Sequence, residues 1–140
     1  MTIKQYLVLL WFTGILWLPV AWLTQVTTMQ TVNVFIADRE AYVRTQAALI
    51  ENTCKKYGNH ATFNISYNGK ATDGTDGCTL WSSEGELVKV YFNKTDLRDH
   101  GIISELVLLM MGRWLLLSIL SILFIKWLRA YRLGKTERLQ

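Results

Sequence analysis

The sequence predicts an α+β membrane protein in which two transmembrane helices flank a small extracytoplasmic domain. Two apolar runs of membrane length lie near the two ends of the 140-residue chain, and the stretch between them is polar. That stretch contains both cysteines of the chain, which suits a single disulfide. We expect the domain to hold one long amphipathic helix and a three-stranded antiparallel sheet.

The two apolar runs set the expected divisions of the chain, because a bilayer core of about 30 Å takes roughly 20 apolar residues as a helix. Pro19, Val20, Ala21 and Trp22 make a poor signal-peptide cleavage site, and bulky Trp17 and Trp22 are typical of membrane anchors. We therefore expect the first run to remain as a signal anchor. The expected divisions are a cytoplasmic N-terminus (1–5), transmembrane helix 1 (6–24), an extracytoplasmic domain (25–101), transmembrane helix 2 (102–125) and a basic cytoplasmic tail (126–140).

The distribution of charge predicts the orientation. The formal net charge of +4 comes from the C-terminal tail, whereas residues 25–101 hold eight Lys or Arg against nine Asp or Glu. Basic residues just beyond a span mark its cytoplasmic side and also attract anionic lipid. Both termini are therefore expected in the cytoplasm, and no contact with nucleic acid is expected. The predicted topology and lipid anchors are Lys126, Arg129, Arg132, Lys135 and Arg138.

The domain between the spans begins with a helical pattern and then changes to alternation. Apolar residues repeat every seven positions at Met29, Ile36, Val43 and Ile50, which predicts an amphipathic helix over residues 26–56. Alternating segments at 63–67, 78–82 and 87–92 predict three strands, with a turn at 68–69 and a loop over 71–77.

The two cysteines predict one disulfide between Cys54 and Cys78. We expect it to join the C-terminal end of the long helix to the second strand. In the chain-entropy model, closing a loop of about 25 residues contributes roughly 3 kcal/mol to stability. That is a large share for a domain of this size.

Arg113 is the candidate functional residue, because it lies inside the second apolar run. A charged side chain there costs at least about 2.5–3.5 kcal/mol near the centre of the helix. Two interpretations remain open: the side chain extends to the outer interface, or it pairs with an acid of a partner helix. Glu105 lies eight residues away, so the two meet more easily between two copies or through a groove at Gly112. The predicted intramembrane partner contact is Glu105, Gly112 and Arg113.

No pattern in the chain indicates catalysis, a metal site or a cofactor. The motifs of serine hydrolases, phosphate-binding loops and zinc proteases are missing, and the acids near Gly74 lack the spacing of a calcium loop. We therefore expect a non-enzymatic protein that acts by contact with membrane lipid and with another inner-membrane protein or a second copy of itself.

The expected role is that of an accessory subunit or modulator of an envelope complex, such as a conjugation or secretion apparatus. Two alternatives remain open: an entry-exclusion or immunity factor against DNA transfer, phage or toxin, and a sensor with an extracytoplasmic ligand-binding domain. A bacterial inner membrane with a periplasmic domain is expected. The glycosylation-like sequences at Asn64 and Asn93 keep a eukaryotic membrane open.

Overall fold

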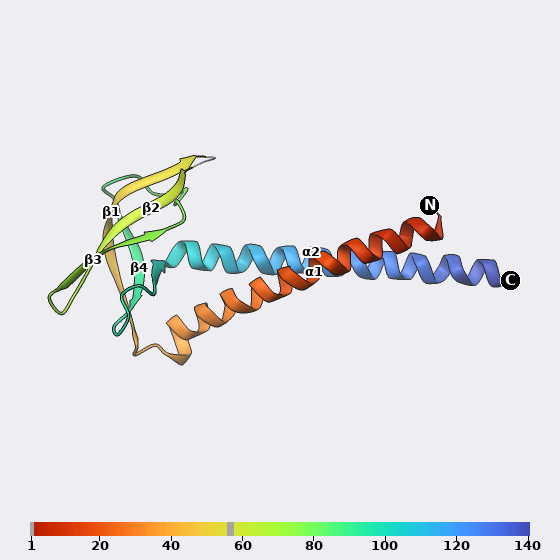
Figure 1. The fold of residues 1–140 in the computed structure, drawn as a ribbon, viewed down its shortest axis with the longest axis horizontal. Helices are drawn as coiled ribbons and strands as arrows, with labels where there is room; N and C mark the ends of the chain where they lie inside the picture. The colour runs from red at the N-terminus through yellow and green to blue at the C-terminus, as the bar shows by residue number, and fades with distance from the viewer. Residues whose placement is uncertain (1, 56–57) are drawn as a thin grey trace. The chain divides into compact units, whose positions relative to one another are not determined.

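The computed structural model describes residues 2–55 and 58–140, apart from the side chain of Arg138. The chain divides into two compact units. The helical unit contains the residues up to Thr28 together with Met110–Gln140, and the sheet unit is Met29–Leu109. Figure 1 labels the helices and strands and colours the ribbon by residue number from the N-terminus to the C-terminus.

Two long helices account for the apolar runs. The first, α1, covers Ile3–Val32 and continues as the short π-helix η1 over Asn33–Ala37, and α2 covers Ile103–Leu139. The segments Ile3–Ala37 and Ile103–Glu137 are each long and apolar enough to cross a membrane. Both helices are longer than the predicted spans.

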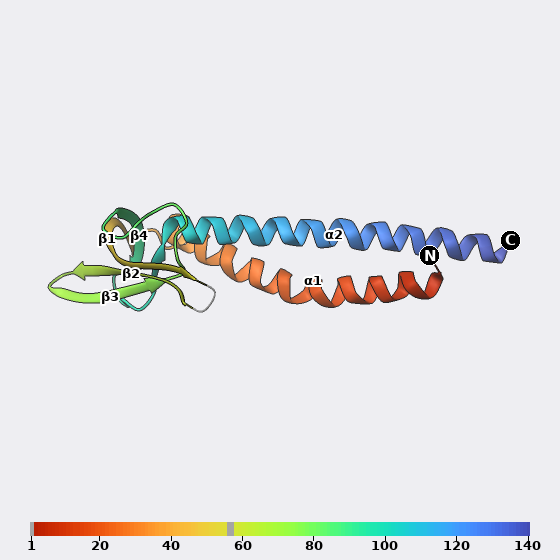
Figure 2. The same ribbon diagram turned by 90° about the horizontal axis from the view of Figure 1, so that it is seen from above.

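Within the helical unit, α1 and α2 run antiparallel and side by side (Figures 1 and 2). The Tyr6 and Trp127 rings are 6.1 Å apart at one end of this pair. Trp17 donates a hydrogen bond to Ser121 further along. Most large apolar side chains of the unit nevertheless point outward, including Trp11 and Trp22 at 70% and 66% exposure. Such apolar surface is unusual for a helix pair in water.

The predicted amphipathic helix over residues 26–56 is wrong. The helix ends at Ala37, and the chain then forms β1, which covers Tyr42–Lys55. The seven-residue repeat is therefore divided between two kinds of structure. Met29 and Ile36 are helical, whereas Val43 and Ile50 belong to the strand. Strand pairing on both sides of β1 overrides the helical period, as tertiary context often does.

The other strands of the sheet are β2 (Gly58–Tyr67), β3 (Lys70–Asp76), β4 (Leu87–Asn93) and β5 (His100–Ile102). The sheet thus has five antiparallel strands rather than the predicted three, in the order β3-β2-β1-β4-β5. The predicted strands at 63–67 and 87–92 are confirmed within β2 and β4. The one at 78–82 is wrong because these residues form a loop, and the expected loop over 71–77 is mostly strand β3. The turn at 68–69 is confirmed, with positive φ at both residues.

Side chains join the two edge strands and so curl the sheet around its core. The Ile102 backbone N–H donates to the Asp76 carboxylate at 2.7 Å. The Thr75 N–H donates to His100 Nε2 at 2.9 Å, and the other ring nitrogen of His100 bonds the Leu97 carbonyl at 2.8 Å. His100 is thus a structural residue, and it makes these two bonds as the neutral imidazole protonated on Nδ1.

The core fills the inside of the curled sheet. Its largest side chains are the fully buried Phe63 and Phe92, surrounded by aliphatic residues of β1, β2, β4 and β5. Gly74 of β3 leaves the space that the Phe63 ring occupies, since a Cβ at Gly74 would lie 2.4 Å from that ring.

The predicted disulfide is present and joins Cys54 to Cys78, with the two Cα atoms 5.3 Å apart. The structural elements predicted to carry the two cysteines are both wrong. Cys54 lies on β1 rather than on a helix, and Cys78 lies in the loop after β3 rather than on a strand. The bond therefore ties this loop to the central strand.

Replacing Gly74 by Ala should destabilise the sheet unit by about 1–3 kcal/mol, because the added methyl group overpacks the core against Phe63. Unfolding of the full-length protein in detergent, followed by near-ultraviolet circular dichroism, measures this loss. Gly58→Ala is the matched control, since its Cβ would lie 3.6 Å from Thr53, an ordinary contact. Equal stability of the two variants would contradict this account of the core.

Candidate interhelical contact site

Polar side chains of α1 and α2 meet inside the helical unit, although both helices are predominantly apolar. Trp114 Nε1 donates to Thr28 Oγ1 at 2.9 Å, and Trp17 Nε1 donates to Ser121 Oγ at 3.0 Å. Arg113 contacts the same turn of α1 as Trp114. These bonds fix how the two helices face each other.

Arg113 is held by the backbone and a hydroxyl of α1. Its Nη1 group donates to the Leu23 carbonyl at 3.1 Å and to Thr27 Oγ1. The Thr27 hydroxyl in turn donates to the Leu23 carbonyl at 2.9 Å. The three groups form a closed triangle in which one carbonyl accepts two side-chain bonds. Both bonds of Arg113 use the same nitrogen, and its Nε and Nη2 groups have no hydrogen bond to a described residue.

A cluster of threonines on α1 makes this contact available. Thr24, Thr27 and Thr28 are spaced three or four residues apart or are adjacent, and each donates its hydroxyl to the carbonyl one turn back. Because each hydroxyl donates its proton in this way, its oxygen can accept a hydrogen bond from the other helix. Thr24 and Thr27 are both 2% exposed.

The other residues of the predicted partner contact are not brought together with Arg113 by any ion pair. Within the described part of the chain, Asp96 forms an ion pair with Arg98, and His60 Nε2 lies 3.1 Å from the Glu51 carboxylate. Glu105 lies in the first turn of α2. A Cβ at Gly112 would meet no atom within 4 Å, so this glycine borders open space. Contact of these residues with a partner stays a prediction.

The predicted anchoring cations lie on the last turns of α2, which extends to Leu139. Lys126 Nζ lies 5.6 Å from the centroid of the Trp127 ring. Arg138 belongs to the same helix, but its side chain lies outside the described part of the structure.

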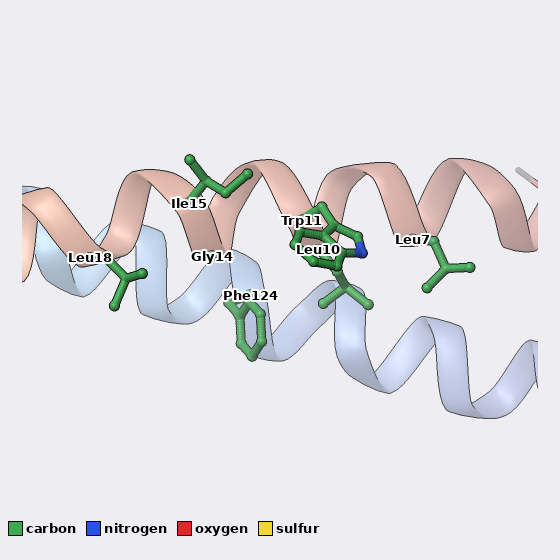
Figure 3. A pocket seen from close by; sticks show the side chains of 7 residues that line it. All are labelled: Leu7, Leu10, Trp11, Gly14, Ile15, Leu18 and Phe124. Carbon is green, nitrogen blue, oxygen red and sulfur yellow. The ribbon is translucent and has the colours of Figure 1, made fainter.

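A shallow apolar groove of about 440 Å³ follows one side of the helical unit (Figure 3). A Cβ at Gly14 would lie 3.9 Å from the Phe124 ring of α2. The lining is almost entirely hydrocarbon, so the groove offers no group for catalysis. Its residues are Leu7, Leu10, Trp11, Gly14, Ile15, Leu18 and Phe124.

A second polar cluster lies in the sheet unit, where two tyrosines of neighbouring strands meet edge to face. Tyr42 donates its hydroxyl to Asp99, and Gln30 donates to the Tyr91 hydroxyl at 2.8 Å. Burial and the hydrogen bond to Asp99 raise the pKa of Tyr42 to about 12, and burial also raises the pKa of Tyr91. Both hydroxyls stay protonated in ordinary conditions, so they serve as structural donors and acceptors.

Sequence reasoning missed Thr27 and the Leu23 carbonyl as the partners of Arg113. The sequence signal for this contact is the group of threonines on the first apolar segment, which can accept hydrogen bonds from an arginine on the second. Among the described residues, no group of three or more metal-binding side chains occurs.

The raised pKa of Tyr42 predicts a loss of stability in alkali. An unfolded tyrosine ionises near pH 10, whereas folded Tyr42 stays neutral until about pH 12, so the native state holds more protons between these values. Stability should therefore fall as the pH rises from 10 to 12, and Tyr42→Phe should reduce the slope while Tyr91 maintains part of it. Thermal unfolding midpoints measured from pH 8 to pH 11.5 test this; identical slopes would contradict it.

Comparison of the chain with protein-family models, curated proteins and solved structures found no match in any of the three.

Proposed function

We propose that the chain is a two-pass membrane protein without enzymatic activity, and that it works by binding another membrane protein. In this proposal it is an accessory subunit or modulator of an envelope complex, such as a secretion or conjugation apparatus. The sheet unit lies on the outer, periplasmic side of a bacterial inner membrane, and both termini lie in the cytoplasm.

The outward-facing apolar side chains of the helical unit support insertion in a bilayer. Val8, Trp11, Leu18 and Trp22 are each at least 66% exposed, and hydrocarbon would cover them at no cost. The cations at the end of α2 and Lys4 near the start of α1 support a cytoplasmic location of both ends. The disulfide supports an oxidising compartment for the sheet unit.

The observation that carries the binding role is that only Nη1 of the Arg113 guanidinium donates hydrogen bonds to described residues. Inside a membrane, a charged group is normally neutralised by an acid or by water. The bonds from Nη1 to Leu23 and Thr27 hold the group in place but supply no negative charge. The remaining donors match the fork geometry that binds a carboxylate. A carboxylate on a partner helix would complete the site, and the open space beside Gly112 leaves room for its approach.

Reporter insertions test the orientation. Alkaline phosphatase placed in the turn at Asn68 and Gly69 should be active in a bacterial host, because this enzyme folds only where disulfides form. The same enzyme fused after Gln140 should be inactive. Activity at the C-terminus, or none in the turn, would contradict the proposed orientation.

Replacing Arg113 by Leu should weaken recovery of the partner about 10- to 100-fold, since a charge-assisted bond is worth roughly 1.5–3 kcal/mol. Purification of the tagged full-length protein from membranes of its natural host, with quantitative mass spectrometry of co-eluting proteins, measures the effect. The sheet unit should keep its disulfide and its circular dichroism spectrum.

Trp114→Phe is the matched control, because it removes the neighbouring interhelical bond to Thr28 without changing any charge. Arg113→Lys keeps the charge and should retain part of the binding. If Trp114→Phe and Arg113→Leu reduce recovery equally, Arg113 only packs the two helices together and the proposed role is wrong.

A further inference from the structure

The loop after β3 displays two large apolar side chains to solvent. Leu80 and Trp81 are 77% and 75% exposed, which is unusual for adjacent residues of this kind on a domain surface. Their neighbours Cys78 and Thr79 are buried, at 8% and 2% exposure. Cys78 and Thr79 therefore pack into the interior of the sheet unit, whereas Leu80 and Trp81 contribute little to it. We call this pair the knob.

The backbone that carries the knob is held rigidly. The Asn52 side chain donates to the Thr79 and Ser82 carbonyls at 2.9 and 2.7 Å, and it accepts from the Thr79 N–H at 3.0 Å. Asn59 accepts from the Cys78 N–H at 2.7 Å, and the disulfide ties the same residue to β1. An exposed aromatic on a fixed loop loses little conformational entropy on binding, as is typical of interface anchors.

The sheet unit also contains a pocket that suits the knob. It has a volume of about 390 Å³, within the range that accepts small-molecule-sized groups, roughly 300–1,000 Å³. Phe35 and Ile103 form apolar walls, and Arg44 and Lys89 add two cations. The Arg44 guanidinium lies over the Phe35 ring at 5.8 Å and its Nη1 donates to the Val34 carbonyl at 2.8 Å, so this cation is fixed at the wall of the pocket.

Knob and pocket are also complementary in charge. The loop that carries the knob continues through Glu84 and Glu86, both exposed, and has no basic residue between Cys78 and Val88. The pocket has cations and no acid among its lining residues. The same acids oppose insertion of the knob into an anionic lipid surface.

One molecule cannot fill its own pocket. The pocket is lined by Arg44, Thr45 and Gln46 near the start of β1, whereas the knob is anchored on Asn52 and Cys54 near its end. From Thr45 to Asn52 a strand rises roughly 23 Å at about 3.3 Å per residue. Contact of knob with pocket therefore requires two molecules.

We propose that the sheet units of two copies of this chain bind head to tail, with Leu80 and Trp81 of one copy in the pocket of the next. The acids at Glu84 and Glu86 then lie near the cations of that pocket. Such a contact pairs different surfaces of the two copies. Repeated in one direction it forms a ring or a row, and exchanged reciprocally about a two-fold axis it closes as a dimer. This contact goes beyond the proposed binding role of Arg113 and does not depend on it.

Photo-crosslinking of the purified full-length protein, reconstituted in lipid vesicles, tests the contact directly. With p-benzoylphenylalanine in place of Trp81, irradiation should give covalent dimers and higher multiples, with crosslinked peptides that contain Phe35–Gln46 or Lys89. The same probe at exposed Thr72 of β3 is the control and should leave monomers. Adducts to lipid alone, crosslinks to other segments, or no crosslinks at all would overturn the proposal.

Further variants measure how strong the contact is. Trp81→Ala should raise the dissociation constant of self-association about tenfold or more, as for an interface anchor, with an unchanged circular dichroism spectrum and disulfide. Glu84→Lys together with Glu86→Lys should weaken association, because the loop then places two cations against Arg44 and Lys89, and adding Lys89→Glu to the same chain should restore part of it. Unchanged association of Trp81→Ala, or a triple variant no better than the double Glu84→Lys, Glu86→Lys variant, would overturn the contact. Arg113→Leu should leave the Trp81 crosslink intact, so the two proposals fail separately.

Discussion

The pairing of β1 on both of its sides is the interaction on which the sheet unit depends. Its first half pairs with β4 and its second half with β2, so that one strand holds both hairpins together. The change of partner takes place beside an irregularity in register between Leu49 and Glu51. Asn52 and Cys54, which fix the long loop after β3, also lie on this strand. A break in β1 would therefore release the loop, the disulfide and both hairpins at once.

Part of this fold was predictable from the sequence, because some signals are local. The two apolar helices, the strands at 63–67 and 87–92, the turn at Asn68 and the pairing of the only two cysteines all follow from short patterns. The central strand was not predictable in this way. Met29, Ile36, Val43 and Ile50 keep a helical period, and the alternation of buried Ala47 and Leu49 is too short to compete with it. Only the long-range pairing of β1 decides between the two.

The candidate site was predictable to the same extent. An arginine in an apolar run is a strong signal, and Arg113 is indeed the charged residue that α1 accommodates. Its partners were not predictable, because an arginine in an apolar helix favours an acid as its partner, whereas the structure supplies a carbonyl and a threonine. The bond to Leu23 belongs to the backbone, which leaves no mark in the sequence. Hydrogen bonds of this kind also explain how the helix pair accommodates the charge of Arg113 without an ion pair to a described acid.

The side-chain closure of the sheet edges restricts how any partner can recognise the sheet unit. Many domains bind peptides by β-augmentation, in which an extended segment adds to a free sheet edge through main-chain bonds. Here the Thr75 and Ile102 N–H groups at the two edges are already occupied by His100 and Asp76. A partner that binds where these two edges meet must therefore contact side chains rather than form main-chain hydrogen bonds. The same occupancy protects the domain from edge-to-edge aggregation, to which an open sheet of alternating apolar residues is prone.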